Sequence, residues 1–400
     1  MPNDIEVMLK NIKRSVKKLL KTAVFWFFRK LPLQNKVVAT TMRGRKFGDN
    51  SKAVVVAIHE KSPDTDIVWL KDSGYKYSLP AWVRGVEYFS LFRTYYELAT
   101  AKVWVSTHLF ESEWKKRKGQ LVVQTWHGGL GIKKIERDVI SEEHKLNEKS
   151  LAKVDHTCAL SDVFISQSDF LSSIYRRAFG YSGPIWECGY PKSDVLFGDN
   201  AEAVAKVRQA FGVNTRFLLY APTFRQEWGE IDWTPYDVDF VRLRDTLEKT
   251  FGGEWTILLK WHPVLIPFLE GRTAPEGVID ATDYPDMQEL VLATDVMLSD
   301  YSSSLFDAAL RGIPCFIFAT DFERYKAERG VYYELEELPF PYARNNDELM
   351  RNIETFDQED YLNKWEAFKR LTGLHETGHA AKDVAERIIS FMHGESVSWE

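Results

Sequence analysis

Histidine side chains follow two apolar runs of the sequence, at points where they could take part in catalysis. Trp126-His127-Gly128-Gly129 follows the first run, and Lys260-Trp261-His262-Pro263 ends the second. Adjacent glycines let the backbone approach a ligand closely, and a histidine titrates near neutrality, which suits a general base. We expect His127 to take a proton from a substrate hydroxyl group and His262 to donate to a phosphate oxygen. A lone histidine is more often structural, so this pattern by itself leaves both roles open.

Further groups that could hold phosphate follow other predicted strands. In Tyr220-Ala221-Pro222-Thr223-Phe224-Arg225, both Thr223 and Arg225 can donate hydrogen bonds to phosphate oxygens, the arginine in a bidentate manner. Lys260 precedes the second histidine at a comparable strand end. Lys133, Lys134 and Arg137, just after the first histidine, either cover an anionic ligand or belong to a solvated helix face.

The stretch Leu298 to Pro314 indicates a strand end followed by a helix. Ser302, Ser303 and Ser304 supply capping side chains, and an apolar face follows them. The free N–H groups at such a helix start suit a phosphate. Asp307 lies four residues after Ser303, where a carboxylate can accept hydrogen bonds from the hydroxyls of a ribose or polyol. An ordinary capped helix with a solvated aspartate remains the alternative.

Two aspartate pairs have the spacing with which some nucleotide-dependent transferases hold a divalent cation. They are Asp64-Thr65-Asp66, before a predicted strand, and Asp237-Val238-Asp239, before a predicted helix. Both positions are typical of turn and cap aspartates. We therefore predict neither a metal site nor a cofactor, and we expect charged side chains and helix starts to neutralise charge during the reaction.

Composition places these motifs in a globular chain of about two domains. The 400 residues are 44% hydrophobic, with a formal net charge of -6 that argues against a general nucleic-acid partner. Three scattered cysteines favour a reducing compartment.

The N-terminus departs from this composition. Residues 9–30 carry eight cations and no acid, interleaved with apolar residues, and the apolar run 23–28 is too short to span a bilayer. This pattern predicts a basic amphipathic helix that lies on an anionic membrane surface. The alternative is a helix packed on the protein's own core. The cations are Lys10, Lys13, Arg14, Lys17, Lys18, Lys21, Arg29 and Lys30.

Short apolar segments alternate with helical ones along the rest of the chain, which predicts an α/β fold with parallel sheets. We expect a membrane-associating helix over 1–32, one Rossmann-like domain over 33–197 and another over 198–400. The last helix could return to the first domain. The predicted strands of the first domain are Val37 to Thr41, Ala53 to Ile58, Ile67 to Leu70, Lys102 to Ser106, Leu121 to Thr125, Val163 to Ser166 and Pro184 to Cys188. After a helix over Gly198 to Ala210, those of the second are Phe217 to Ala221, Thr256 to Lys260, Val278 to Asp280, Val296 to Leu298 and Cys315 to Phe318.

Five motifs in this order resemble the CDP-glycerol glycerophosphotransferases, the bacterial teichoic-acid primases and polymerases with relatives that build capsules. The resemblance extends from about Gly48 to Ile389. Two departures are Lys192, where the family usually has arginine, and Gly129-Leu130, where it commonly has threonine and proline. The motifs are Trp126-His127-Gly128, Gly189-Tyr190-Pro191-Lys192-Ser193-Asp194, the run from Tyr220 to Arg225, His262-Pro263, and Ser299-Asp300-Tyr301-Ser302-Ser303 with Asp307.

The resemblance implies a fold similar to GT-B, with two domains facing a cleft, and attachment to the cytoplasmic face of the membrane. It implies that glycerol phosphate moves from CDP-glycerol to a lipid-linked glycan or polyol-phosphate acceptor, with His127 as base and His262 as the second catalytic residue. The alternatives are a CDP-ribitol-using homologue, a GT-B glycosyltransferase that uses a nucleotide-sugar, and a non-catalytic membrane-bound scaffold. The expected donor-binding residues are Trp126, Gly128, Gly129, Lys192, Thr223, Arg225, Lys260, Ser302, Ser303 and Asp307.

Overall fold

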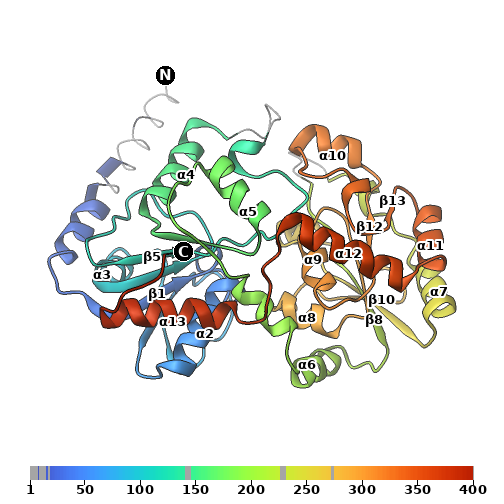
Figure 1. Cartoon of the computed structure of the whole chain (residues 1–400), viewed down its shortest axis with the longest axis horizontal. Coiled ribbons are helices and arrows are strands. Elements are labelled where there is room, and N and C mark those ends of the chain that lie inside the picture. Colours follow the sequence, from blue (N-terminus) through green and yellow to red (C-terminus); the bar gives the residue numbers. More distant parts are fainter. Residues whose placement is uncertain are drawn as a thin grey trace.

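Two α/β units lie side by side in the computed structural model, each built around a parallel sheet (Figure 1). The structure describes residues 8, 15–16, 19–139, 146–225, 231–271 and 274–399. This arrangement confirms the predicted fold class of two Rossmann-like domains.

The first sheet has seven parallel strands in the order β3-β2-β1-β4-β5-β6-β7. Its strands are apolar runs that are buried almost completely, as in β5 and β6, because helices cover both faces. The strands are β1 (Gln34–Thr40), β2 (Asp66–Lys71), β3 (Val83–Glu87), β4 (Ala101–Ser106), β5 (Leu121–Gln124), β6 (Val163–Ser166) and β7 (Ile185–Glu187). The helices between them are α2 (Asp49–Lys61), α3 (Arg93–Thr100), α4 (Glu148–Leu160) and α5 (Asp169–Ile174), which continues as a π-helix over Tyr175–Phe179.

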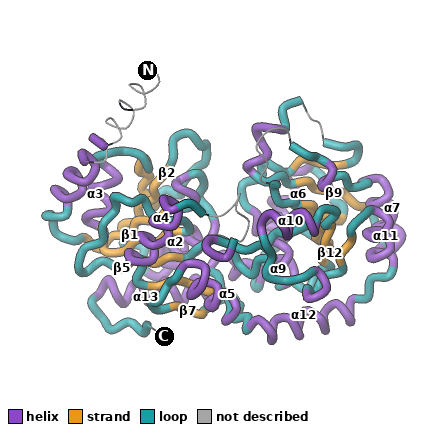
Figure 2. The backbone as a smooth tube through the Cα atoms, turned by 90° about the horizontal axis from the view of Figure 1, so that it is seen from above, coloured by secondary structure: helices purple, strands orange, loops and turns teal. Residues whose placement is uncertain are grey.

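The second sheet has six parallel strands in the order β10-β9-β8-β11-β12-β13. They are β8 (Arg216–Tyr220), β9 (Trp255–Leu259), β10 (Val278–Asp280), β11 (Val296–Ser299), β12 (Cys315–Phe318) and β13 (Tyr342–Ala343). The helices are α6 (Ala201–Phe211), α7 (Phe240–Phe251), α8 (Met287–Ala293), α9 (Ser304–Ala309), α10 (Phe322–Arg329), α11 (Asn346–Glu354) and α12 (Gln358–Thr372). Figure 2 shows the strands of each unit enclosed by helices, with α12 along one side of the second unit.

The last helix, α13 (Ala380–His393), leaves the second unit and packs beside α2 of the first (Figure 1). Val384, Ile388 and Met392 of α13 belong to the same buried apolar cluster as β1 and β5. The chain therefore crosses between the units twice, once before α6 and once before α13.

One predicted strand was wrong and two were missed. Ala53 to Ile58 lies inside α2, whose buried residues Ser51, Val54, Val55 and Ile58 have helical spacing, so the run of valines concealed a helix period. The strand β3 contains an exposed arginine and a glycine, and β13 has only two residues, so neither forms an apolar run.

Residues 19–28 form a helix whose two faces differ. Phe25 is buried and its ring meets Tyr95 edge-on at 5.5 Å, while Phe28 meets Tyr96 in the same way. Leu19, Leu20, Trp26 and Phe27 are exposed. One side thus packs on the first unit and the other presents apolar side chains to the surroundings.

Only part of the predicted basic helix can be described. Lys10, Lys13, Arg14, Lys17 and Lys18 lie outside the described residues, whereas Lys21 pairs with Glu113 and Lys30 lies 4.0 Å from the centre of the Trp26 ring. Within the described ranges, no helix combines the length and apolar character needed to cross a bilayer.

Candidate active site

The loop that follows β5 carries the first histidine, and a buried asparagine holds it in place. Asn50, in the first turn of α2, donates from its side-chain amide to the carbonyl oxygens of Thr125 and Trp126, at 3.3 and 3.2 Å. Its Oδ1 accepts the backbone N–H of Lys192 at 3.0 Å. Trp126 is buried and has a φ of 52°, a conformation that costs energy for a residue with a side chain. Asn50 therefore ties the turn at Thr125 and Trp126 to the backbone of Lys192.

His127 is held in the tautomer that a general base requires. Its Nδ1 lies 2.8 Å from the carbonyl oxygen of Thr107, which can only accept, so Nδ1 carries the proton and Nε2 keeps its lone pair. The side chain reaches solvent, yet desolvation by the surrounding protein lowers the pKa of His127 below the usual 6.5. At neutral pH the ring is thus uncharged and able to accept a proton.

His262 is held in the opposite tautomer. The backbone N–H of Val264 donates to His262 Nδ1 at 3.3 Å, so the proton of the neutral ring is on Nε2. Burial and the charge of Lys133 lower its pKa to about 4, and the Phe224 ring packs against it at 4.5 Å between ring centres. His262 is therefore a neutral hydrogen-bond donor at physiological pH.

A loop from the first unit crosses to the second and places a lysine near both histidines. Leu130 and Ile132 are buried in the apolar cluster of the second unit, and Lys133 pairs with Val331 as an isolated antiparallel bridge. Burial and Arg329 lower the pKa of Lys133 to about 8. The charge of Lys133 contributes to the lowered pKa values of both His127 and His262, so we assign the three side chains to one site.

An ion pair joins the units on another side of this region. Lys192 Nζ lies 2.6 Å from Asp307 Oδ2, which also accepts from Gln288 at 3.1 Å. Burial would lower the pKa of Lys192, but Asp307 and Asp49 raise it above its usual value. Asp307 is buried, so the solvated aspartate considered from the sequence is not what the structure has. Its carboxylate already holds a cation.

Thr223 and Arg225 lie beneath the surface in a network with two aspartates. Thr223 donates to Asp300 from its backbone N–H at 2.8 Å and from its hydroxyl group. The Arg225 guanidinium is 1% exposed and bonds to Asp300 and Asp321, which raise its pKa despite burial. The hydrogen bonds predicted for a phosphate are thus made largely to the protein itself.

Lys260 and the serine motif also have internal partners. Lys260 Nζ donates to the carbonyl oxygens of Ala281, Thr282 and Tyr284, and burial lowers its pKa to about 8. The helix α9 has six residues, and Ser303 makes no capping bond with its side chain. The backbone N–H of Ser304 donates to Ser302 Oγ at 3.3 Å. Ser302 rather than Ser303 therefore caps this short helix.

The two glycines after His127 differ in what surrounds them. The carbonyl oxygen of Gly128 accepts from the Tyr190 hydroxyl at 2.8 Å, which ties the loop to the Gly189–Asp194 motif. A Cβ atom on Gly129 would lie 2.3 Å from Gln167 Oε1, so a side chain there would require Gln167 to move. This contact explains why a glycine fits where the family commonly has threonine.

One aspartate of each pair considered for a metal ion bonds to a protein group in the structure. Asp239 caps α7 through the N–H of Arg242 at 3.1 Å, and Asp66 bonds to Arg84. Among the described residues, the side chains that come close enough to share an ion are Asp169, Glu187 and His375, with both acids exposed. His375 Nε2 lies 2.7 Å from Asp169 Oδ1, so a hydrogen bond accounts for that contact.

Four residues of this region were not predicted as part of the site. They are Asn50, Asp300, Asp321 and Glu376, each of which contacts a predicted site residue or its motif. Burial raises the pKa of Glu376 to about 8. The signal for Asn50 was its position directly after Gly48-Asp49, at the start of an apolar helix.

Comparison with known proteins shows the family of this chain. The model of the family described as CDP-Glycerol:Poly(glycerophosphate) glycerophosphotransferase matches residues 23–390. The teichoic acid glycerol-phosphate transferase of Staphylococcus aureus is 27% identical, over 94% of this chain and 100% of the relative. A teichoic acid poly(glycerol phosphate) polymerase of Bacillus subtilis is 27% identical over 85% of this chain and 46% of its own length. A teichoic acid ribitol-phosphate primase of Bacillus spizizenii is 26% identical over 95% and 98%.

Solved structures have the same fold. The wall teichoic acid polymerase TagF aligns with a TM-score of 0.81 and 24% identity, covering 98% of this chain and 99% of that one. A complex of MnaA with UDP from S. aureus aligns with a TM-score of 0.51 and 11% identity, over 91% and 100% of the two chains. These matches show the two-domain architecture.

Proposed function

Because the chain belongs to the CDP-glycerol:poly(glycerophosphate) glycerophosphotransferase family, we propose that it transfers glycerol phosphate from CDP-glycerol to an acceptor hydroxyl group in teichoic-acid synthesis. The observation that carries the residue roles is the pair of histidines held in opposite tautomers, each with a pKa that the charge of Lys133 helps to lower. A base and a hydrogen-bond donor are what this transfer needs at its two ends.

In the proposed reaction, an acceptor oxygen attacks the β-phosphorus of CDP-glycerol while the bond to the bridging oxygen breaks. The acceptor proton passes to His127 Nε2, which the contact with Thr107 leaves unprotonated. A phosphodiester forms and CMP departs. Atoms and charge balance without any further reactant.

His262 is assigned to the leaving group. Its Nε2–H can donate to the bridging oxygen or to a phosphate of the departing CMP, where negative charge grows. We assign Lys133 as a cation for the pyrophosphate, because it has no ion-pair partner among the described residues and its pKa of about 8 keeps it mostly charged at neutral pH. His262 and Lys133 would thus supply two donors to the pyrophosphate.

We assign the other predicted donor residues two kinds of role. Trp126, Gly128, Thr223, Arg225 and Lys260 position the loops around the donor, since each has a bonding group occupied within the protein. Gly129 is assigned the same role because Gln167 leaves no room for a side chain there. Ser302 and Ser303 lie at the surface of the site as hydroxyl donors. Lys192 and Asp307 join the units, and CDP-glycerol would reach them only by competing with their mutual ion pair.

The acceptor is proposed to be a lipid-linked glycan or polyol phosphate at the cytoplasmic face of the membrane. The apolar face of the helix over residues 19–28 supports this placement, because it exposes four apolar side chains and one of them, Trp26, lies beside Lys30. Eight cations over residues 9–30 would add attraction to anionic lipids.

A direct assay separates this function from its alternatives. The purified chain with a membrane fraction should release CMP from CDP-glycerol, and mass spectrometry should find the acceptor heavier by one glycerol phosphate or more. Faster CMP release from CDP-ribitol than from CDP-glycerol would identify CDP-ribitol as the donor, in keeping with the similarity to a ribitol-phosphate primase. UDP release from UDP-sugars without CMP release would favour the glycosyltransferase instead.

A further inference from the structure

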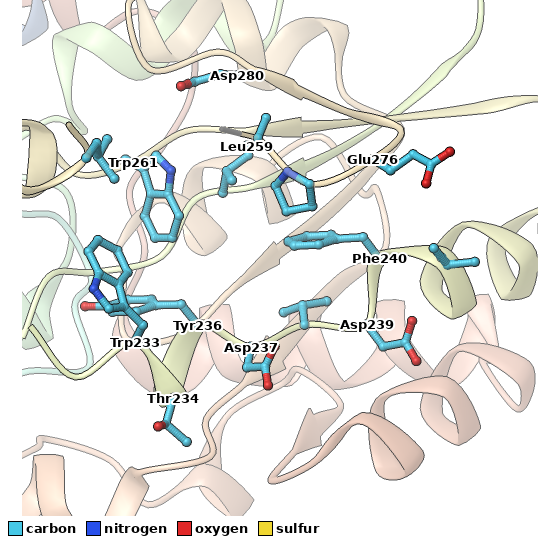
Figure 3. A pocket seen from close by; sticks show the side chains of 15 residues that line it. Trp233, Thr234, Tyr236, Asp237, Asp239, Phe240, Leu259, Trp261, Glu276 and Asp280 are labelled. Atoms are coloured by element: carbon cyan, nitrogen blue, oxygen red, sulfur yellow. The ribbon is translucent and has the colours of Figure 1, made fainter. Parts of the chain in front are cut away.

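A cavity lies in the C-terminal unit, and neither His127 nor His262 is among its lining residues. It has a volume of about 580 Å³ and opens between the end of β9, the end of β10 and the start of α7. Figure 3 shows the rings of Trp233, Tyr236, Phe240 and Trp261 around it. A cavity of this size is in the range of small-molecule sites.

The aromatic wall is assembled before any ligand arrives. Trp233 and Tyr236 each meet the Trp261 ring edge-on, at 5.6 and 5.4 Å between ring centres. The Tyr236 hydroxyl accepts the backbone N–H of Arg225 at 3.1 Å, which anchors the wall to the buried arginine network. A rigid aromatic wall gives apolar contact area at little cost in conformational entropy.

Carboxylates occupy the rim. Asp237, Glu276 and Asp280 are exposed and Asp239 is half-buried, so the lining residues that the structure describes include four acids and no cation. Such a rim disfavours phosphate, so the donor's pyrophosphate and a phosphodiester chain are poor candidates for this cavity. Its ligand therefore differs in chemistry from the ligand of the histidine region.

Two of these acids already have partners that weaken the negative field. Asp239 accepts from Arg242 N–H at the start of α7, whose N-terminus carries a partial positive charge, and Asp280 accepts from Thr282 N–H at 2.8 Å. Because backbone N–H groups partly offset the negative charge of these acids, the rim attracts a cation less strongly. The carboxylate oxygens can still accept strong hydrogen bonds from neutral hydroxyl groups. The flat rings can stack on the apolar face of a sugar.

We propose that this cavity binds a neutral sugar ring of the acceptor, an assignment that rests on the proposed transferase function. Trp261 forms part of its wall and directly precedes His262. A sugar held here would anchor the acceptor beside the donor site while its reacting hydroxyl group extends to His127.

Two variants and one control test the site. Trp233→Ala removes part of the wall, and Asp237→Asn removes one rim charge from an exposed position where the fold does not depend on it. Trp399→Ala, an exposed tryptophan of the terminal segment that meets Trp186 at 6.3 Å, is the matched control. Saturation-transfer NMR with the full chain would use a neutral disaccharide, diacetylchitobiose, alongside glycerol phosphate and tetramethylammonium.

The disaccharide should give the strongest transfer in the wild type and in Trp399→Ala, and both site variants should lose most of it. With a sugar-bearing acceptor, the acceptor KM should rise roughly three- to tenfold in Trp233→Ala, as expected for one aromatic contact. The KM for CDP-glycerol should stay unchanged.

Equal disaccharide binding in all four proteins, or preference for tetramethylammonium, would overturn the assignment. A wild type that binds the disaccharide but releases no CMP would refute the transferase function and leave the sugar site in place. A wild type that releases CMP, with unchanged acceptor KM in both site variants, would refute the sugar site alone. If Trp233→Ala fails to fold, Asp237→Asn decides the outcome.

Discussion

The buried arginine of the second unit gives a prediction that separates positioning from direct donor binding. Arg225→Ala would leave the carboxylates of Asp300 and Asp321 buried without their cation. Removing one partner of a buried ion pair typically costs about 3–5 kcal/mol. In a unit of this size, each kcal/mol lowers the melting temperature by about 2–4 °C, so we expect a decrease of roughly 6–20 °C.

Differential scanning calorimetry of the wild type and Arg225→Ala, with and without CDP-glycerol, measures this effect. The matched control is Arg242→Ala, because Arg242 pairs with Asp347 at the surface, with both side chains more than half exposed. Such a pair contributes about 0–1 kcal/mol. An unchanged melting temperature in Arg225→Ala, together with a much higher KM for CDP-glycerol, would show that Arg225 binds the donor and would refute the positioning role.

Three further predictions concern charge, metal and membrane. Since the pKa of Lys133 is about 8, kcat/KM should decrease above pH 8 as the lysine loses its proton. Lys133→Arg should shift this alkaline decrease to higher pH, whereas the control Lys134→Arg should leave it in place. An unshifted decrease in Lys133→Arg would exclude Lys133 as its origin. Activity should survive EDTA, because each group assigned to the pyrophosphate is a side chain, and a loss restored only by Mg²⁺ or Mn²⁺ would contradict this. Replacing the four exposed apolar residues of the 19–28 helix with serine should release the protein from anionic vesicles while turnover on a soluble acceptor persists. Unchanged co-sedimentation with the vesicles would place the membrane attachment elsewhere. Substitution is preferred to deletion of residues 1–30, because the deletion would also remove the buried Phe25.

The sequence predicted the sheets well because parallel strands covered on both faces are continuous apolar runs. β6, β10 and β12 have the predicted bounds, whereas the valines at 54–56 belong to a helix with one face against the sheet. Composition alone favoured a strand there. The spacing of Ser51, Val54, Val55 and Ile58 held the correct signal.

The site was predictable as a set of motifs but not as a set of contacts. His127 and His262 follow their strands as expected, yet the tautomer of each depends on a backbone group, Thr107 or Val264, which no spacing rule specifies. The partners of Arg225 and Lys192 are 75 to 115 residues away in the chain. The Lys192 pair arises from the docking of the two units, and the Arg225 pairs arise from the folding of the second unit. Sequence patterns therefore predicted these hydrogen-bond donors without predicting their partners.

The general base is the centre of the proposed mechanism, and one comparison tests it most directly. CMP release from CDP-glycerol is measured for the wild type and His127→Ala with the same membrane acceptor, while calorimetric titration measures donor binding to each. We predict that His127→Ala loses about 10² to 10⁴ in rate, the usual contribution of a general base, and binds CDP-glycerol as the wild type does. Turnover at the wild-type rate by a folded His127→Ala protein would contradict the assignment of His127 as the base.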